Sequence, residues 1–405
     1  MKVRIIILAA FTIAIAVSGS LLSVSLWGDK PEQLESAEII ISSTGQTPAE
    51  IIRQNSLPPP PVLKALSIDS TAAKSTTLSD LGITTEQART KISRMMIQYN
   101  EERSKNWKKI ALKFALWFLV LPVPFVLMLQ RKISARRRLI LTGVGVAVFG
   151  VALGADPSPM GTVKDAIYLM VAHQTVFMPR IVAFAIFMLT VVIANKFICS
   201  WGCQFGLLQE FLFRLNRRRF DRKGIMRQYK PPFWLTNTIR VSVLAIFTAI
   251  AALWTFDLIG LIDPFKIYHP SILIGISIGF VALILMASLF IYRPWCHFAC
   301  PFGLTSWLGE KLAVFRIKVD HHKCDACNLC SRACPSNVME AILKRDKKTI
   351  PDCFSCGTCI DVCPQDAIRF TATRKDQGAW SDSLALREQK RGNREPSGNR
   401  PTFDA

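Results

Sequence analysis

Cysteine is missing from the first 198 residues of this 405-residue chain, although 12 cysteines follow. No Cys-x-x-Cys-His string is present, which excludes c-type haem, and no glycine fingerprint for a dinucleotide follows a predicted strand. Acidic residues are scarce, with 29 Asp and Glu against 50 Lys and Arg, so the formal net charge is +21. The basic clusters flank apolar runs, which argues against nucleic acid as a partner and for a membrane protein.

Hydrophobic residues make up 50% of the chain and are concentrated in long runs. A helix needs roughly 20 such residues to cross about 30 Å of hydrocarbon. The first run shows no small-residue cleavage site, so we expect a retained anchor rather than a cleaved signal peptide. The sequence predicts an all-α polytopic membrane domain of about six transmembrane helices, at Ile5–Trp27, Ile110–Leu129, Leu139–Ala155, Ile181–Ile198, Ile239–Phe256 and Ile272–Tyr292.

The loops between these runs differ in charge. Basic residues crowd the segments 131–138 and 214–230, whereas the segments 156–180 and 263–271 carry few. The positive-inside rule therefore places both termini and the two basic loops in the cytoplasm of a bacterial inner membrane. Residues 28–106 then lie in the periplasm.

Two local signals occur in that outer segment. Thr84 and Gln87 have the spacing of a helix capping box, so a helix is expected from there, running into the second transmembrane helix. Pro58 to Pro61 are expected to be extended polyproline.

Eight of the cysteines form two runs of one pattern, each Cys-x2-Cys-x2-Cys-x3-Cys-Pro. This is the bacterial ferredoxin run, in which the fourth cysteine binds the other cluster. Structural zinc also uses Cys-x2-Cys pairs, but two full runs ending in proline argue against it. We therefore assign one [4Fe–4S] cluster to Cys324, Cys327, Cys330 and Cys363, and the other to Cys353, Cys356, Cys359 and Cys334.

The remaining cysteines form two further pairs, Cys199-x3-Cys203 and Cys296-x3-Cys300. Each pair follows a predicted transmembrane helix, each precedes Phe-Gly-Leu, and each helix hairpin carries Asp-Pro at its outer turn. These features predict an internal repeat of a two-helix hairpin, related by a twofold along the membrane normal. Four thiols brought together in this way can hold a third cluster or a metal ion, or cycle between dithiol and disulfide. The alternative is four inert thiols packed at helix ends.

The domains expected from these patterns differ in class. The C-terminal ferredoxin domain should be α+β with two clusters, and the tail after it should be disordered. The expected ranges are a transmembrane anchor at 1–27, a periplasmic segment with a helix at 28–106, a membrane domain at 107–315, the ferredoxin domain at 316–373 and the tail at 374–405.

At this point the residues resemble a known family. Six helices, two CxxxC motifs and a C-terminal dicluster ferredoxin are similar to the NapH/NosR/CcoG group of membrane polyferredoxins, over residues from about 110 to 372. The string from Cys199 to Glu210, Cys-Ser-Trp-Gly-Cys-Gln-Phe-Gly-Leu-Leu-Gln-Glu, is especially like that of NosR-type proteins. Gln204 departs from the proline usual in the family. The outer region is too short for a flavin domain and has no Ser-Gly-Ala-Thr string, so the resemblance points to the flavin-free, NapH-like branch.

The resemblance implies electron transfer between the quinone pool, cytoplasmic iron–sulfur centres and a periplasmic or membrane redox partner. We expect an electron-transfer subunit of a quinol-linked oxidoreductase, with the CxxxC cysteines in the transfer step. The alternative, implied by CcoG-like relatives, is a metal-handling or assembly factor that reduces copper or matures a cofactor. Quinol oxidation also needs groups that take up protons. Candidate quinone-site residues are Asp156, His173 and Asp263 at the outer face and Glu210 at the inner face.

Overall fold

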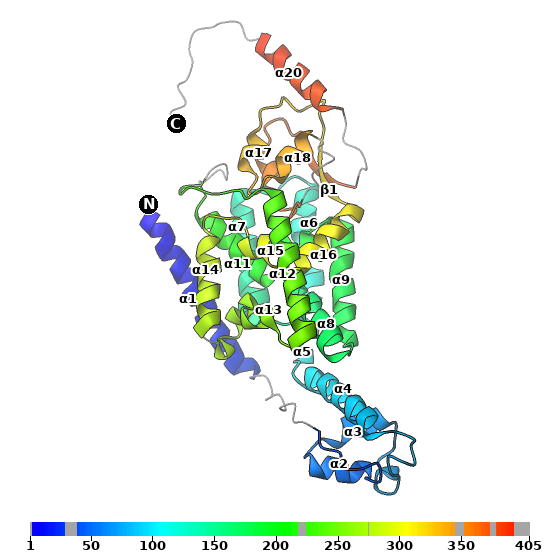
Figure 1. Ribbon diagram of the computed structural model, residues 1–405. Helices are drawn as coiled ribbons and strands as arrows, with labels where there is room; N and C mark the ends of the chain where they lie inside the picture. Colours follow the sequence, from blue (N-terminus) through cyan, green and yellow to red (C-terminus); the bar gives the residue numbers. More distant parts are fainter. Residues whose placement is uncertain are drawn as a thin grey trace.

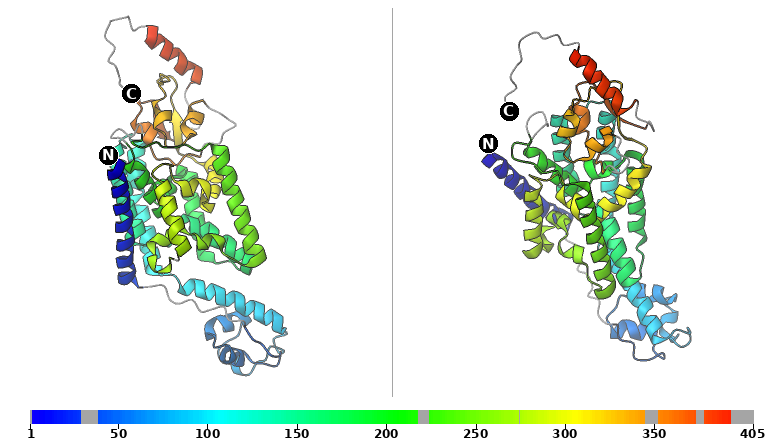
Figure 2. Two further views of the ribbon diagram at one scale, coloured as in Figure 1. Left: turned by 60° about the vertical axis from the view of Figure 1, so that its left-hand side comes forward. Right: turned by 45° about the horizontal axis from the view of Figure 1, so that its top comes forward.

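The computed structural model describes residues 2–28, 39–217, 224–273, 275–344, 352–372 and 378–392. A bundle of helices forms the middle of the molecule, with a small C-terminal domain at one end and a small helical domain at the other (Figure 1). We call the end that faces away from the C-terminal domain the distal end, and the helical domain there, residues 39–103, the distal domain. Figure 2 shows the same order from two further directions.

Three helices of the bundle are long and apolar enough to cross a membrane: Lys2–Trp27, Trp107–Leu129 and Phe233–Trp254. Met178–Ala194 and Gly275–Ala287 are apolar but shorter. The predicted third span, Leu139–Ala155, falls on α7 and the π-helix η2, and α7 begins before the span, with three arginines at 136–138. The long elements of the bundle are α1 (Lys2–Trp27), α5 (Trp107–Val120), α6 (Pro122–Leu129), α7 (Ala135–Gly145), η2 (Val146–Ala152), α9 (Met178–Ala194), α12 (Phe233–Trp254) and α14 (Gly275–Ala287).

The other elements fill the interior of the bundle and its distal turns. Almost every residue of α11 is buried, and α11 packs against α7, η2 and α1. The chain after α9 therefore folds back into the bundle instead of leaving it. These elements are α8 (Pro159–His173), α10 (Phe197–Trp201), α11 (Gln204–Leu215), α13 (Leu258–Leu261), η3 (Pro264–Tyr268), η4 (Pro270–Ile272), α15 (Pro294–Phe298), α16 (Pro301–Gly309) and η5 (Glu310–Leu312).

The C-terminal domain combines a two-stranded antiparallel sheet with short helices. Strand β1 (Arg316–Val319) pairs with β2 (Ile368–Thr371), and Val319 lies opposite Ile368. Helices α17 (Leu329–Ala333), α18 (Val338–Lys344) and α19 (Thr358–Asp361) complete it. The tail was expected to be disordered, but α20 (Trp380–Gly392) forms there, with Trp380 packed against the domain core. Residues 393–405 lie outside the described residues.

The distal domain is built from α2 (Pro48–Gln54), α3 (Pro59–Leu66), η1 (Ala72–Lys74) and α4 (Thr85–Arg103). The capping box at the start of α4 is present, since Thr84 Oγ1 accepts from the Gln87 amide at 3.3 Å. The extended polyproline expected at 58–61 is wrong: α3 begins at Pro59, because proline fits the first turn of a helix, where no amide donor is needed. Helix α4 also does not run into α5, since Asn106 caps a new helix.

Both predicted basic loops lie against the C-terminal domain. Arg131 pairs with Asp366, Arg217 donates to the Ala333 carbonyl at 2.8 Å, and Lys230 donates to the Ser331 carbonyl at 3.0 Å. The basic loops and the ferredoxin-type cysteines are therefore at the same end of the bundle.

Candidate functional site

Two cavities in the C-terminal domain are each bordered by four cysteines. Every set contains three cysteines of one run and the last cysteine of the other, which is the exchange that the sequence pattern predicts. One cavity is lined by Cys324, Cys327, Cys330 and Cys363, and the other by Cys334, Cys353, Cys356 and Cys359.

The backbone of each run makes tight turns around its cavity. Ala326 and Asn328 have positive φ values of 53° and 61°, and Ser355 and Gly357 have values of 51° and 75°. Left-handed residues alternating with right-handed ones turn successive amides towards one side, which favours a bound anion. An iron–sulfur cube with thiolate ligands is such an anion, so the loops fit the group that the cysteine spacing implies.

The electrostatics of the thiols point the same way. Burial raises the pKa of Cys330 to about 12, and the nearby Cys363 and Cys324 add to the effect. A thiolate in this position therefore needs a bound cation to be stable, and iron supplies one. Within the described part of the chain, no three His, Cys, Asp or Glu side chains gather closely enough to hold a single metal ion.

The other four cysteines lie inside the bundle, each 7% exposed. Cys203 precedes α11 and Cys300 precedes α16. Their backbone conformations are closely similar, with φ −72° and ψ 114° at Cys203 and φ −69° and ψ 118° at Cys300. A negative charge on Cys296 acts electrostatically on the other three thiols. The two pairs are therefore brought together inside the bundle.

Two glycines let the backbone close around these pairs. A Cβ atom on Gly206 would lie 2.8 Å from the Cys199 carbonyl oxygen, and one on Gly303 would lie 2.8 Å from that of Cys296. Both distances are too short for a real Cβ contact. Each Phe-Gly-Leu string thus packs its glycine onto the first cysteine of its own pair, which explains why the string accompanies both pairs.

Buried cations surround the four thiols. Lys196, Arg240 and Arg293 have exposed fractions of 0–1%. Arg293 donates to the Cys199 carbonyl, and Arg240 donates to the carbonyls of His297 at 3.1 Å and Gly303 at 2.8 Å. Buried charges of this kind need compensating anions, which Asp352 supplies for Lys196 and Arg240 and Glu210 supplies for Arg293.

Gln204, which replaces the usual proline after Cys203, connects this site to the distal end. The side-chain amide of Gln204 donates to the Ala155 carbonyl at 2.5 Å, and its main-chain carbonyl accepts from the Tyr268 hydroxyl at 2.9 Å. A proline could accept the second bond but could not make the first. His297, inside the second pair, uses Nδ1 for the Arg293 carbonyl at 3.2 Å.

The loop that carries Cys353 and Cys356 is docked directly onto the bundle. Asp352 is 1% exposed and pairs with Lys196 and with Arg240, the latter at 2.8 Å. Ser200 Oγ donates to the Phe354 carbonyl, and Trp201 Nε1 donates to the Ser355 carbonyl at 3.2 Å. The segment that holds Cys199 therefore contacts the segment that holds Cys353.

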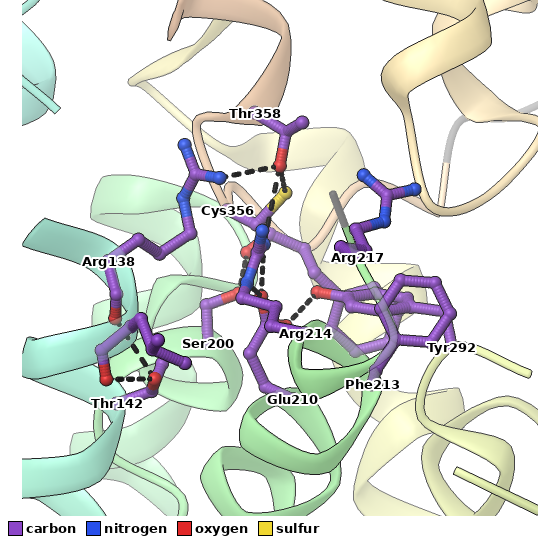
Figure 3. Close-up of polar contacts among 12 residues, drawn as sticks. Arg138, Thr142, Ser200, Glu210, Phe213, Arg214, Arg217, Tyr292, Cys356 and Thr358 are labelled. Carbon is purple, nitrogen blue, oxygen red and sulfur yellow. Dashed lines mark hydrogen bonds and ion pairs between the residues drawn. The ribbon is translucent and has the colours of Figure 1, made fainter. Parts of the chain in front are cut away.

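Figure 3 shows a second part of this junction, where two arginines approach Thr358. Arg138 and Arg214 donate to the Thr358 hydroxyl at 3.0 and 3.3 Å, and this hydroxyl lies 3.3 Å from the Cys356 sulfur. Glu210 lies below them, paired with Arg214 and Arg293 and hydrogen-bonded to the Tyr292 hydroxyl. The structure thus places Glu210 in an ion-pair network that joins the domains.

The three residues proposed for a quinone site at the outer face do not form one site. Asp156 pairs with Lys105 at 3.4 Å, and the His173 ring packs edge-on against Tyr168 with 5.2 Å between centroids. Asp263 caps η3 through the Phe265 amide at 2.9 Å. Burial raises the pKa of Asp263 to about 6, although the Lys164 ammonium nearby opposes the shift.

Three adjoining cavities lie along one side of the bundle. The lateral pocket, about 490 Å³, lies between the start of α5, α8 and α9, and its polar lining includes Lys105, Asp156, Ser158, Thr162 and Arg180. The apolar groove, about 250 Å³, continues from it between α5, α6 and α9. The polar hollow, about 410 Å³, lies at the distal surface between the ends of α1 and α4, the start of α5 and Tyr268.

Several buried charges were missed from the sequence. Lys113 lies within the predicted second span and is 0% exposed, and its ammonium donates to the Gly154 carbonyl at 2.8 Å. Arg240 lies within the predicted fifth span and is 1% exposed. A charged residue inside an apolar run is the signal that identifies both, because such residues usually serve function.

Comparison with known proteins agrees with these sites. A family model described as a 4Fe-4S dicluster domain matches residues 323–368, which contain the eight C-terminal cysteines. A second model, described as a 4Fe-4S binding domain, matches twice, at residues 176–223 and 272–319, and each match contains one CxxxC pair. No solved structure gives a significant match.

Curated relatives are similar over about half of the chain. The putative electron transport protein YccM of Escherichia coli is 26% identical over 51% of this chain and 60% of its own length. The ferredoxin-type protein NapH of the same organism is 29% identical over 46% of this chain and 65% of its own. The regulatory protein NosR of Pseudomonas aeruginosa is 26% identical over 40% of this chain and 22% of its own. The chain thus spans less than two thirds of these relatives' lengths.

The cysteine sets, the apolar helices and these relatives agree on one class. Together these findings support a membrane polyferredoxin family of the NapH/NosR type and an iron–sulfur electron-transfer role.

Proposed function

We propose that this protein carries electrons between the quinone pool and a redox partner through three iron–sulfur sites. Two are the cysteine sets of the C-terminal domain, and the third is formed by Cys199, Cys203, Cys296 and Cys300. When bound, each cluster accepts or donates one electron at a time. The protein's own residues hold the buried CxxxC site against the loop that carries Cys353 and Cys356.

The observation that carries this proposal is the docked loop from Asp352 to Cys359. Its backbone accepts hydrogen bonds from Ser200 and Trp201, which lie between Cys199 and Cys203 in the chain. The Phe354 ring packs on His297, which lies between the other two cysteines, with 5.0 Å between ring centroids. Both CxxxC pairs therefore contact the loop that binds the nearer C-terminal site, so the domain is held in place rather than tethered.

Three features support a cluster at the four buried cysteines instead of inert packing. The donor set is four thiols, the cations Arg240 and Arg293 occupy matching positions beside the two pairs, and Gly206 and Gly303 make matching close contacts. This correspondence also supports an internal repeat related by a twofold axis.

The lateral pocket and the apolar groove together suit a quinone. The pocket is of ordinary ligand size, and its polar groups lie at the distal end. The groove shares Phe114 and Ile186 with the pocket and continues toward Phe125 and Phe197 near the C-terminal domain. Exposed Met178 and Val182 show that the pocket opens on the outside of the bundle. A quinone would enter from the lipid, with its head near Asp156 and its isoprenoid tail along the groove.

An aromatic cluster connects the lateral pocket to the buried cysteines. Phe114 lines the pocket and packs on Trp117 at 5.3 Å between centroids, and Trp117 packs on Phe187 at 5.2 Å. Trp117 Nε1 donates to the carbonyl of Gly202, the residue before Cys203, at 3.1 Å. His173, Asp263 and Glu210 line neither the pocket nor the groove. Of the four quinone-site candidates, Asp156 is thus the one that we retain.

We place the protein in a bacterial inner membrane, with the C-terminal domain in the cytoplasm and the distal domain in the periplasm. The two basic loops, at 131–138 and 214–230, support this orientation, since their described residues contact the C-terminal domain. A periplasmic or membrane redox protein is the expected partner, and the absence of a flavin-domain string favours the NapH-like branch.

The proposal is tested by anaerobic reduction of the purified protein with a quinol analogue, followed by optical and EPR spectra. We expect the quinol to reduce at least one cluster and added quinone to re-oxidise it. If quinol does not reduce the clusters but copper(II) re-oxidises them, the proposal is contradicted and a copper-reducing assembly factor is favoured.

A further inference from the structure

We infer that Asp156 passes protons from a quinol in the lateral pocket to the polar hollow, so that turnover separates charge across the membrane. The inference rests on the proposed function, because it requires quinol in that pocket. It adds a second activity: protons leave at the distal end, while electrons leave through the C-terminal domain.

The two cavities meet at Asp156. Lys105, Trp107, Ile110 and Asp156 line both of them. The lateral pocket is otherwise mainly apolar, whereas the polar hollow also includes Asn106, Lys108, Lys109 and His269 among its lining residues, and so can hold water. A carboxylate between an apolar ligand pocket and a wet hollow can take a proton on one side and release it on the other.

The Asp156 carboxylate is suitably placed and suitably charged. Its side chain is 35% exposed, and one oxygen, Oδ2, lies 3.4 Å from Lys105 Nζ. A proton acceptor must be ionised before it acts, and the cation beside it favours that state. The same cation favours release of the proton to water afterwards.

The other charged groups around Asp156 come from four elements. On α4, the Glu101 carboxylate also pairs with Lys105, at 3.8 Å, and it pairs with Arg180 at 2.6 Å. On α5, Lys113 reaches the Asp156 carbonyl at 3.5 Å, and Lys109 lines the hollow. His269, after η3, lines the hollow as well, and Asp165 on α8 pairs with Arg180. Cations predominate among these groups.

Electrons take the opposite direction. The lateral pocket borders Phe114, which leads through Trp117 to the Cys203 segment and then to the docked loop at Phe354. In the balanced step, quinol breaks two O–H bonds and becomes quinone. Its two protons pass in turn through Asp156 to the distal side, and its two electrons leave one at a time and reduce two equivalents of a one-electron acceptor on the C-terminal side.

The experiment uses the full-length protein in liposomes with the C-terminal domain facing outwards. A quinol analogue is the donor, a membrane-impermeant one-electron acceptor is added outside, and a trapped pH dye reports the lumen. We expect two protons in the lumen for each quinol oxidised, with a lumen that becomes positive. Quinol oxidation without lumen acidification would overturn the inference and leave the proposed function standing. If quinol reduces nothing while dithionite still reduces the clusters, the proposed function itself fails.

A variant pair tests the role of Asp156. Asp156→Asn keeps the size of the side chain but cannot accept a proton, so quinol oxidation should fall about 100-fold or more, as expected for loss of a general base. Dithionite reduction of its clusters should be unchanged, which shows that the variant is folded. Glu102→Gln, an exposed change on α4, is the matched control. Equal rates of quinol oxidation in the two variants would show that Asp156 does not carry the protons.

Discussion

Replacing Asp352 by asparagine should loosen the C-terminal domain from the bundle. Asp352 is 1% exposed and faces two buried cations, Lys196 and Arg240, with Arg240 at 2.8 Å. Breaking a buried ion pair by removing one partner costs about 3–5 kcal/mol, because the remaining charge is left uncompensated. The asparagine oxygen still accepts one bond, so we take the lower value, about 3 kcal/mol. That energy corresponds to a change of about 100-fold in the equilibrium for local opening of the loop.

Hydrogen exchange under anaerobic conditions measures this opening at the amides of residues 354–359. We expect their exchange to be about 100-fold faster in Asp352→Asn, while amides of α12 keep their protection. Glu340→Gln is the matched control, since Glu340 pairs with Lys344 at 2.7 Å on the surface, with both side chains more than half exposed. Such a pair contributes about 0–1 kcal/mol. If the two variants exchange alike, the buried ion pairs do not hold the loop.

Three further predictions follow from single residues. Cys327→Ser should lose about four irons and lower the thermal stability of the C-terminal domain, measured by iron analysis and calorimetry; full iron content would contradict its role as a ligand. Gly206→Ala should cost about 1–3 kcal/mol through overpacking, whereas Gly279→Ala, which meets nothing within 4 Å, should not destabilise the protein; equal denaturant midpoints would refute the close contact. The raised pKa of Asp263, about 6 against an ordinary 3.8, means that the folded state binds more protons between these values, so this carboxyl lowers stability as pH rises through that window. The melting temperature of Asp263→Asn minus that of the wild type should therefore increase from about pH 4 to about pH 7, and a constant difference would contradict it.

The parts of the fold that were predictable are those encoded locally. The two ferredoxin runs place their cysteines within a few residues of one another, so spacing alone suggests the sets that the structure gathers around two cavities. The helix from Thr84 was predictable because both halves of its capping box lie within four residues. The tail was misjudged because α20 is polar, and its few apolar residues, Trp380 among them, are too sparse to give a strong signal.

The junction between the domains could not be predicted, because its partners are far apart in the sequence. Lys196 meets Asp352, 156 residues later, and Glu210 meets Arg293, 83 residues later. Nothing local marks either pair. The burial of the CxxxC site likewise depends on packing that no local pattern marks. Leu207, Leu208 and Leu212 are fully buried on α11, and Cys203 immediately precedes this helix.

Iron and sulfide analysis of the anaerobically purified protein, beside the Cys203→Ser/Cys300→Ser variant, tests the central claim most directly. The account predicts about twelve irons in the wild type and about eight in the variant, with the EPR signals of the two C-terminal clusters unchanged. About eight irons in both proteins would show that the four buried cysteines hold no cluster, and the proposed electron path through the bundle would be wrong.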